Sequence, residues 1–193
     1  MENVLISGSI EVVCGPMFAG KTEELIRIIR RLEYAKQKFL VFKPKIDTRH
    51  NTEEIVSHNN NRKNTISVEN SAEIYQYIND EIKAVIIDEA QFFDEGIVKV
   101  AEDLADRNIR VIAGGLDRNF RGEPFGPMPQ LLAIAESVKK LTAICVVSGL
   151  PATRTQRMIN GKPAKYDDPI VLIGAEESYE PRARKYHEVP GKK

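Results

Sequence analysis

The fold is decided by residues 10–32, which read IEVVCGPMFAGKTEELIRIIRRL. The first five of these residues, Ile10 to Cys14, are rich in β-branched side chains, which is typical of a strand. After Thr22, apolar residues recur at helical spacing, namely Leu25, Ile28, Ile29 and Leu32. A strand, a glycine-bearing loop and a helix thus follow one another, which predicts a βαβ unit and a parallel sheet.

The loop between this strand and this helix fits the pattern G-x-x-x-x-G-K-[ST]. Its residues are Gly15, Pro16, Met17, Phe18, Ala19, Gly20, Lys21 and Thr22. In such a loop, backbone N–H groups and the positive end of the helix surround phosphate oxygens. Lys21 is expected to reach the outer phosphates, and the Thr22 hydroxyl to hold Mg²⁺. A glycine turn with a solvated lysine is the alternative, but the flanking strand and helix favour a nucleotide-binding loop.

A second charged feature follows the apolar run Ala84 to Ile87. Four successive apolar residues indicate a strand that is covered on both faces. The run ends in Asp88 and Glu89, at the carboxyl edge of the sheet, where ligands bind. Asp88 is predicted to orient Mg²⁺, and Glu89 to take a proton from a hydroxyl group or from water. The alternative for Glu89 is an ordinary surface acid, and Gln91 is assigned to the nucleotide site.

The rest of the chain alternates between strand and helix patterns up to about residue 140. Further strands are expected at residues 39–42 and 109–113, and a loop at 46–63. The first helix is expected to end near Lys38, and further helices to start at Asn70, to cover residues 97–104 and to cover residues 131–138. Short strands are expected later, at residues 142–147, 154–159 and 169–173, with Asn160-Gly161 as a hairpin turn.

This order of elements predicts an α/β fold in two parts. Residues 1–140 are expected to form a P-loop NTPase core with a mostly parallel, RecA-like sheet. Residues 141–193 are expected to form a small β-rich domain that ends in a loose basic tail.

Composition and charge exclude several classes of protein. The 193 residues include 28 basic and 28 acidic ones, so no overall field attracts a polyanion, and no nucleic-acid partner is expected. The longest apolar runs fall far short of the roughly 20 residues that cross a bilayer, so no membrane partner is expected. The first residues lack a secretory pattern, and two cysteines, Cys14 and Cys145, suit a reducing compartment; we expect a cytoplasmic protein.

The motifs leave three functions open. A kinase would direct Glu89 at a substrate hydroxyl, whereas an ATPase would direct it at water. A regulatory module would bind ATP through residues 15–22 without turnover. Length and zero net charge favour the kinase over a nucleic-acid motor, and the absence of an Asn-Lys-x-Asp string sets a GTP-binding switch aside.

Several segments resemble one family closely. They are GPMFAGKT at 15–22, DEAQFF at 88–93, GLDRNF at 115–120, KLTAIC at 140–145 and ESYEPR at 177–182. They are similar to the thymidine kinases of the cytosolic, tetrameric type. The resemblance implies transfer of the γ-phosphate of ATP to the 5′-hydroxyl of thymidine, with deoxyuridine also possible, in nucleotide salvage. It makes Glu89 the base, with Asp88 and Thr22 around Mg²⁺.

The resemblance also implies where the nucleoside binds. Thymine would be held by a late loop called the lasso and by aromatic walls, and Met17, Leu116 and Thr155 would border its methyl group. The implied substrate-binding residues are Phe92, Phe120, Phe125, Val171, Leu172, Ile173, Gly174, Ala175 and Tyr179. A homotetramer and feedback inhibition by thymidine triphosphate are further implications of the resemblance.

One feature departs from that family. Its members commonly hold a structural zinc ion with two C-x-x-C pairs, but here only Cys145 of the four cysteines is present. Even with a nearby serine and His187, one thiolate cannot supply the four ligands of a structural zinc site, so we expect no zinc.

Elemental analysis of protein purified without a metal-binding tag tests this departure. We expect far less than one zinc ion per chain, because the soft ligands are missing. Stoichiometric zinc would contradict the expectation.

Overall fold

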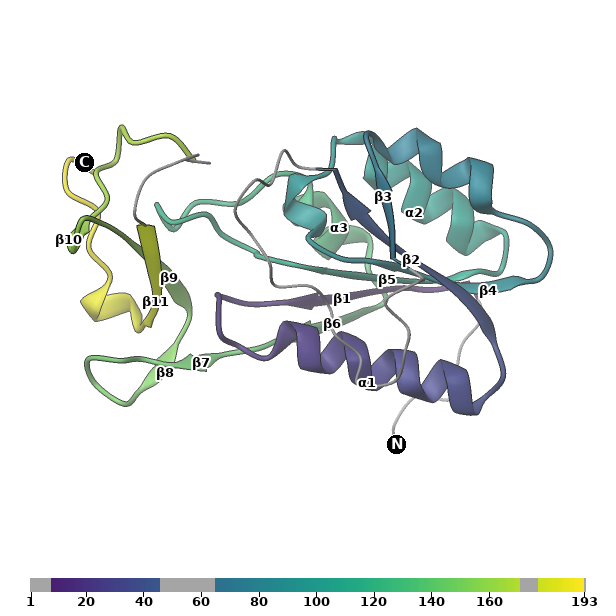
Figure 1. Ribbon diagram of the computed structural model, residues 1–193, viewed down its shortest axis with the longest axis horizontal. Helices are drawn as coiled ribbons and strands as arrows, with labels where there is room; N and C mark the ends of the chain where they lie inside the picture. The colour runs from purple at the N-terminus through teal and green to yellow at the C-terminus, as the bar shows by residue number, and fades with distance from the viewer. Residues whose placement is uncertain (1–7, 46–64, 171–176, 193) are drawn as a thin grey trace.

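The computed structural model describes residues 8–45, 65–170 and 177–192, and its centre is a six-stranded sheet (Figure 1). The strand order is β3-β2-β4-β5-β1-β6, and every pair of neighbours is parallel. The strands are β1 (Ile10–Cys14), β2 (Lys38–Pro44), β3 (Thr65–Val68), β4 (Ile82–Ile87), β5 (Arg110–Gly115) and β6 (Ser137–Lys140). All six strands present their carboxyl ends at one edge, and the predicted α/β class is confirmed.

Helices cover both faces of the sheet. One face carries α1 (Lys21–Tyr34), and the other carries α2 (Gly96–Asp106), α3 (Met128–Ile134) and the 3₁₀ helix η2 (Ser71–Tyr77) (Figure 1). Two apolar clusters result, one under α1 with Leu25, Leu32 and Ile86, and one on the other face with Phe42, Ile87, Ile97 and Leu104. Since Ile86 and Ile87 belong to different clusters, β4 is covered on both faces, as its apolar sequence predicts.

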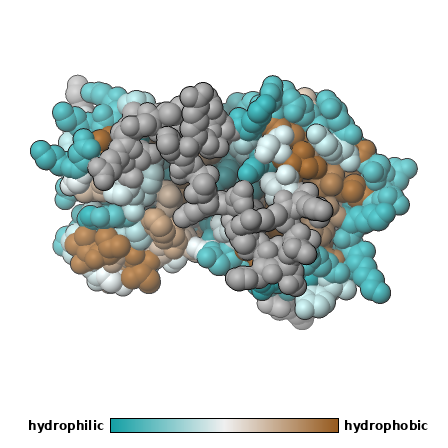
Figure 2. Space-filling model, viewed as in Figure 1, coloured by the Kyte–Doolittle hydropathy of each residue, from teal (hydrophilic) through white to brown (hydrophobic). Residues whose placement is uncertain are grey.

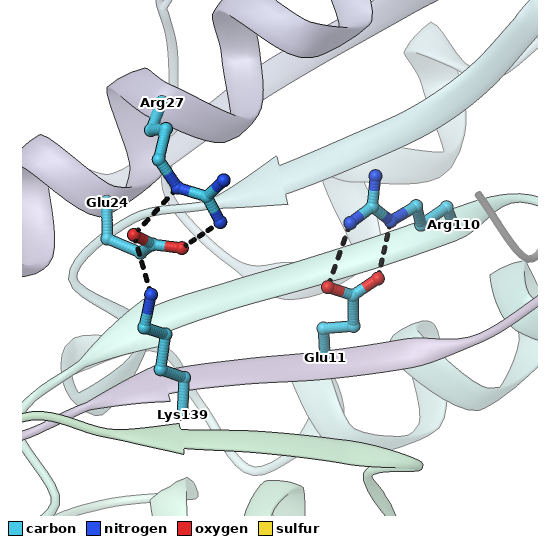
Figure 3. Close-up of polar contacts among 5 residues, drawn as sticks. All are labelled: Glu11, Glu24, Arg27, Arg110 and Lys139. Atoms are coloured by element: carbon cyan, nitrogen blue, oxygen red, sulfur yellow. Dashed lines mark hydrogen bonds and ion pairs between the residues drawn. The ribbon is translucent and has the colours of Figure 1, made fainter. Parts of the chain in front are cut away.

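Two groups of ion pairs join distant parts of this core (Figure 3). The guanidinium of Arg110 in β5 donates two hydrogen bonds to Glu11 in the neighbouring β1, one of them with an Nη2–Oε2 distance of 2.9 Å. In the first turn of α1, Glu24 accepts from Arg27 at 2.7 Å and lies 2.9 Å from the ammonium of Lys139 in β6. The Glu24 carboxylate therefore links the helix that follows the loop to the edge strand.

A smaller, β-rich part follows β6. The strand β7 (Ala143–Ile144) pairs with β8 (Pro151–Ala152), and β9 (Arg154–Ile159) lies between β10 (Lys162–Pro163) and β11 (Glu177–Arg182), all antiparallel. Asn160 and Gly161 form the turn between β9 and β10, both with positive φ, as the hairpin pattern predicts. A small antiparallel region was predicted and is confirmed, whereas a domain boundary at residue 141 stays a prediction.

The end of the chain packs against this β-rich part. A short 3₁₀ helix, η4 (Arg184–Tyr186), is followed by Glu188, whose backbone N–H donates to the Gln156 side chain at 2.8 Å while its carbonyl accepts from the same side chain at 2.9 Å. A ring nitrogen of His187 lies 2.8 Å from the carbonyl oxygen of Phe120. A loose tail was expected from the sequence. These contacts were not predicted, because polar and backbone groups make them and such contacts leave no apolar pattern in the sequence.

Some element boundaries differ from the sequence-based expectations. The first helix ends at Tyr34, before Lys38, because Lys36 adopts a left-handed φ of 53° and the chain turns into β2. The run 131–138 is divided, since Ala135 is extended and Val138 belongs to β6. The segment after Asn70 is a 3₁₀ helix, although Asn70 caps it by accepting from Glu73 N at 3.2 Å.

The β-strand expectations also need correction. The four-residue β3 was not predicted, because it is too short to give a clear period. Only Ala143 and Ile144 of the expected strand 142–147 lie in a strand. Of the expected strand 169–173, residues 169 and 170 are not in a strand and the rest lie outside the described residues, as does the expected loop at 46–63.

The surface of the β-rich part carries an apolar patch at the turn between β7 and β8. Ile144, Val146, Val147 and Leu150 are each more than half exposed. This patch accounts for the brown area at the lower left of Figure 2. Across the described ranges, no helix is long and apolar enough to cross a membrane.

The Glu24 ion pairs predict a pH-dependent stability. Hydrogen bonds from Arg27, and then from Lys139, lower the pKa of Glu24 from 4.5. The ionised carboxylate therefore stabilises the folded state fully at pH values above 4.5. This stabilisation is lost as the pH falls from 4.5 through the lowered pKa of the folded state. Glu24→Gln is expected to reduce the free energy of unfolding by about 0.5–1 kcal/mol at pH 7 and by less at pH 3, as measured by urea denaturation.

The neighbouring Glu23 provides the control, because it is exposed and has no ion pair with any described residue. Glu23→Gln should change the stability only slightly at either pH. An equal loss for Glu24→Gln at both pH values would contradict the assignment.

Candidate active site

The carboxyl ends of β1, β4 and β5 bring three polar segments to one edge of the sheet. The loop 15–20 follows β1, the pair Asp88-Glu89 follows β4, and Leu116-Asp117 follows β5. Because β5 lies between β1 and β4, the loop and the acidic pair lie on either side of one strand. This is the arrangement expected of a RecA-like P-loop core, and it places the predicted residues at the usual ligand-binding edge.

The loop adopts a conformation that its glycines permit. Gly20 has a φ of 83° and precedes the first turn of α1, while Gly15 has a φ of 149°. A Cβ atom on Gly15 would lie 2.5 Å from the Leu141 carbonyl oxygen, so a larger residue does not fit there. Phe18 also has a positive φ, 63°, and its side chain is 60% exposed. The loop therefore turns tightly between β1 and α1 and presents Phe18 to solvent.

Lys21 lies over this loop and close to the acidic pair. Its ammonium donates to the Pro16 carbonyl at 2.8 Å, so the lysine folds back over its own loop. Burial lowers the pKa of Lys21, and the negative charges of Glu89 and Asp88 oppose that shift. The structure thus places Lys21 at the same edge of the sheet as Asp88 and Glu89, which follow it by more than 60 positions in the sequence.

Asp88 and Glu89 differ in their surroundings. Burial raises the pKa of Asp88 from 3.8 to about 7, and the neighbouring charge of Glu89 adds to the shift. Glu89 is exposed and has a left-handed backbone, with φ 53° and ψ 40°. A non-glycine residue in this region costs free energy and often marks a functional site. Asp88 is thus the less accessible of the two acids, while Glu89 is exposed on the strained turn.

Gln91 orients the Glu89 carboxylate. It is 2% exposed and belongs to the short 3₁₀ helix η3 (Ala90–Phe92). Its amide nitrogen donates to Glu89 Oε2, and its Oε1 accepts from the Leu116 N–H at 2.9 Å. The observed contacts of Gln91 therefore fix a carboxylate and the end of β5, while its predicted role in nucleotide binding stays a prediction.

The predicted aromatic residues divide into two groups. Phe92 and Phe125 form an edge-to-face pair, with ring centroids 5.2 Å apart and an interplanar angle of 83°. Phe120 is 4% exposed, and the guanidinium of Arg157 lies 5.2 Å from its ring centroid. Tyr179 lies in β11 opposite Arg157 of β9. The predicted residues Val171, Leu172, Ile173, Gly174 and Ala175 lie outside the described residues.

The donor set fits a hard divalent cation. Two adjacent carboxylates stand at the end of β4, and the raised pKa of Asp88 shows that its charge is poorly compensated by the protein alone. Carboxylate and hydroxyl oxygens are the ligands that Mg²⁺ prefers, usually together with phosphate oxygens and water. Asp88 and the exposed Thr22 on the first turn of α1 are therefore the residues of this site that could hold it.

Asp117 lies at the same edge of the sheet, and it was not predicted from the sequence as a site residue. It is 6% exposed, and its Oδ2 lies 2.8 Å from Lys140 Nζ and 3.4 Å from Arg118 Nη1. Its charge also acts on Lys21 and Cys14. The rule that selected Asp88, an acid just beyond the carboxyl end of a strand, also applies to Asp117 and could have found it.

The predicted zinc position contains one buried thiol. Burial raises the pKa of Cys145, but hydrogen bonds from the Ser148 side chain and from backbone N–H groups outweigh this effect and lower it to about 7. His187, the other candidate ligand, contacts the Phe120 carbonyl instead. Within residues 8–45, 65–170 and 177–192, no group of three or more His, Cys, Asp or Glu side chains could hold a metal ion. The absence of zinc stays a prediction.

The fold and the site together are those of a P-loop protein of the phosphotransferase kind, with a glycine-bearing loop, a lysine and an accessible carboxylate at one sheet edge. A comparison with protein families gives a more specific result. The thymidine kinase family model matches residues 8–187, and the chain belongs to this family. Membership implies a kinase that uses ATP and Mg²⁺ to phosphorylate thymidine.

The raised pKa of Asp88 predicts how stability depends on pH without metal. The burial penalty falls on the charged form, so the folded state loses stability as the pH rises from 3.8 to about 7. Asp88→Asn removes this charge and is expected to increase the free energy of unfolding by about 1–2 kcal/mol at pH 8, with little effect at pH 4. Thermal or urea unfolding in the presence of a chelator measures it.

Asp94 provides a control of opposite sign. Hydrogen bonds from Ser71 and Gly96 outweigh burial and lower the pKa of Asp94. Asp94→Asn should therefore destabilise the protein at pH 8. If Asp88→Asn were also destabilising at pH 8, the account of Asp88 would be wrong.

Proposed function

We propose that this protein transfers the γ-phosphate of ATP to the 5′-hydroxyl of thymidine. The observation that carries the proposal is the placement of an accessible carboxylate, Glu89, at the same edge of the sheet as Lys21 of the phosphate-binding loop, where its charge acts on that lysine. Phosphoryl transfer to a hydroxyl needs an anion site for the donor and a base for the acceptor, close together. Membership of the thymidine kinase family supports thymidine as the acceptor.

Each polar residue then has a role. The N–H groups of residues 18–22 bind the phosphates of ATP, and Lys21 leaves the Pro16 carbonyl to neutralise their charge. Asp88 and Thr22 hold Mg²⁺, which when bound offsets the negative charge of the phosphates. Glu89 accepts the proton of the 5′-hydroxyl, and the hydrogen bond from Gln91 holds its carboxylate in place.

The nucleoside would bind beside this centre. The proposed contacts are the aromatic residues Phe92, Phe120 and Phe125, the lasso residues 171–175 and Tyr179. The T-shaped Phe92–Phe125 pair supports an aromatic wall three residues beyond Glu89. Acceptance of deoxyuridine, a role in salvage, a cytoplasmic location, a homotetramer and feedback inhibition by thymidine triphosphate are proposed from family membership.

Product analysis with Mg-ATP, in the presence and absence of thymidine, tests the function. The wild type is expected to form thymidine monophosphate. Glu89→Gln keeps the shape of the side chain but cannot accept a proton, so it should reduce the rate about 100-fold or more. Glu102→Gln, an exposed residue of α2, is the matched control and should leave the rate unchanged.

Two outcomes would contradict the proposal. Release of free phosphate without nucleoside monophosphate would indicate an ATPase that directs Glu89 at water. Unchanged thymidine monophosphate formation by Glu89→Gln would exclude Glu89 as the base.

A further inference from the structure

The β-rich part supports the phosphate-binding loop at three alternate residues. At Gly15, the approach of the Leu141 carbonyl leaves no space for a side chain. At Met17, the backbone N–H donates to the Thr155 hydroxyl oxygen at 3.1 Å. At Ala19, the side chain packs against a buried cluster formed by Ala143, Cys145, Ala152 and Ala183. The loop therefore rests along its length on residues that follow the core sheet.

The contact at Met17 fixes one peptide group of the loop at both ends. The N–H of Met17 donates to Thr155, and the carbonyl of the same peptide, from Pro16, accepts from Lys21 Nζ at 2.8 Å. Since a peptide group is planar, holding its N–H also sets the direction of its carbonyl. The bond to Thr155 therefore constrains the direction of the carbonyl that accepts from Lys21.

Thr155 is suited to hold this position. It is 5% exposed and lies in β9, the central strand of the three-stranded sheet. A β-branched side chain has few accessible rotamers, so its hydroxyl is fixed when the strand is fixed. The loop amide therefore bonds to a rigid partner that is 138 positions away in the sequence.

We propose that Thr155 is a positioning residue for ATP, acting through the Pro16–Met17 peptide and Lys21. The proposal rests on the assignment of Lys21 and the loop to the phosphates of ATP. When ATP binds, Lys21 moves from the Pro16 carbonyl to the phosphates, while the bond from Met17 to Thr155 keeps the loop in shape. Without the Thr155 hydroxyl, the peptide can rotate, and the loop and lysine must be ordered during binding, which weakens affinity.

Calorimetric binding of Mg-ADP without nucleoside tests this role. Thr155→Val is nearly isosteric but cannot accept a hydrogen bond, and it should weaken binding about three- to ten-fold, as one lost hydrogen bond does. Thr155→Ser keeps the hydroxyl and should stay within about two-fold of the wild type. Thr153→Val is the matched control, because the Thr153 hydroxyl contacts the Arg154 guanidinium and not the loop, and it should bind as the wild type does.

Wild-type affinity in Thr155→Val would overturn the proposal, and so would an equal loss in Thr155→Ser. A rise in the KM for thymidine with unchanged Mg-ADP affinity would also overturn it, and would place Thr155 in the nucleoside pocket only. The assay requires no turnover. If the wild type and the variants bind Mg-ADP with the expected order of affinities but the wild type forms no thymidine monophosphate, the proposed function is refuted and this inference still holds.

If Thr155→Val does not fold, amide hydrogen exchange of the wild type provides the test. The Met17 amide should be protected in the nucleotide-free protein, because it is hydrogen-bonded to Thr155. Exchange at the rate of an open loop would contradict the proposal.

Discussion

Parallel pairing of β1, β4 and β5 is the constraint on which the site depends. Parallel strands place their carboxyl ends at a common edge. The loop after β1 and the acids after β4 and β5 therefore lie at one edge of the sheet, although they are far apart in the sequence. The buried clusters on both faces hold these strands in register, since a shift by one residue would move every side chain of a strand to the opposite face of the sheet. The chemistry of the edge is therefore set by the apolar pattern of the strands.

At this edge the protein concentrates opposing charges. The charges of Asp88, Glu89 and Asp117 all act on Lys21, and burial disfavours the charged forms of Asp88 and Lys21 alike. Such a site is costly for the protein alone, because its charges are only partly compensated. In the proposed complex, the phosphates of ATP and a divalent cation would supply charges of both signs and compensate the charges of Lys21 and Asp88. Binding of ATP with a divalent cation would thus compensate these buried charges in the same step.

Sequence reasoning could predict what depends on local pattern and spacing. The strands β1, β2, β4 and β5, the glycine loop and the placement of Asp88 and Glu89 follow from apolar runs and from residues at strand ends. Contacts between distant residues could not be predicted. The bond of Met17 to Thr155 depends on how the β-rich part packs, and the pairing of Gln91 with Glu89 depends on a left-handed turn that no single residue type demands. The predicted helix at 131–138 extends too far for a related reason, because Val138 belongs to β6 and pairs with the neighbouring β1.

The central claim is that Glu89 faces the acceptor hydroxyl while Lys21 holds the donor phosphates. A crystal structure of the Glu89→Gln variant with ATP, Mg²⁺ and thymidine tests it most directly. The account predicts the 5′-oxygen at hydrogen-bond distance, roughly 2.6–3.2 Å, from the side chain at position 89, with the γ-phosphate beyond it and Lys21 on the phosphates. A nucleoside bound with its 5′-oxygen turned away from position 89, or Lys21 still on the Pro16 carbonyl, would contradict it.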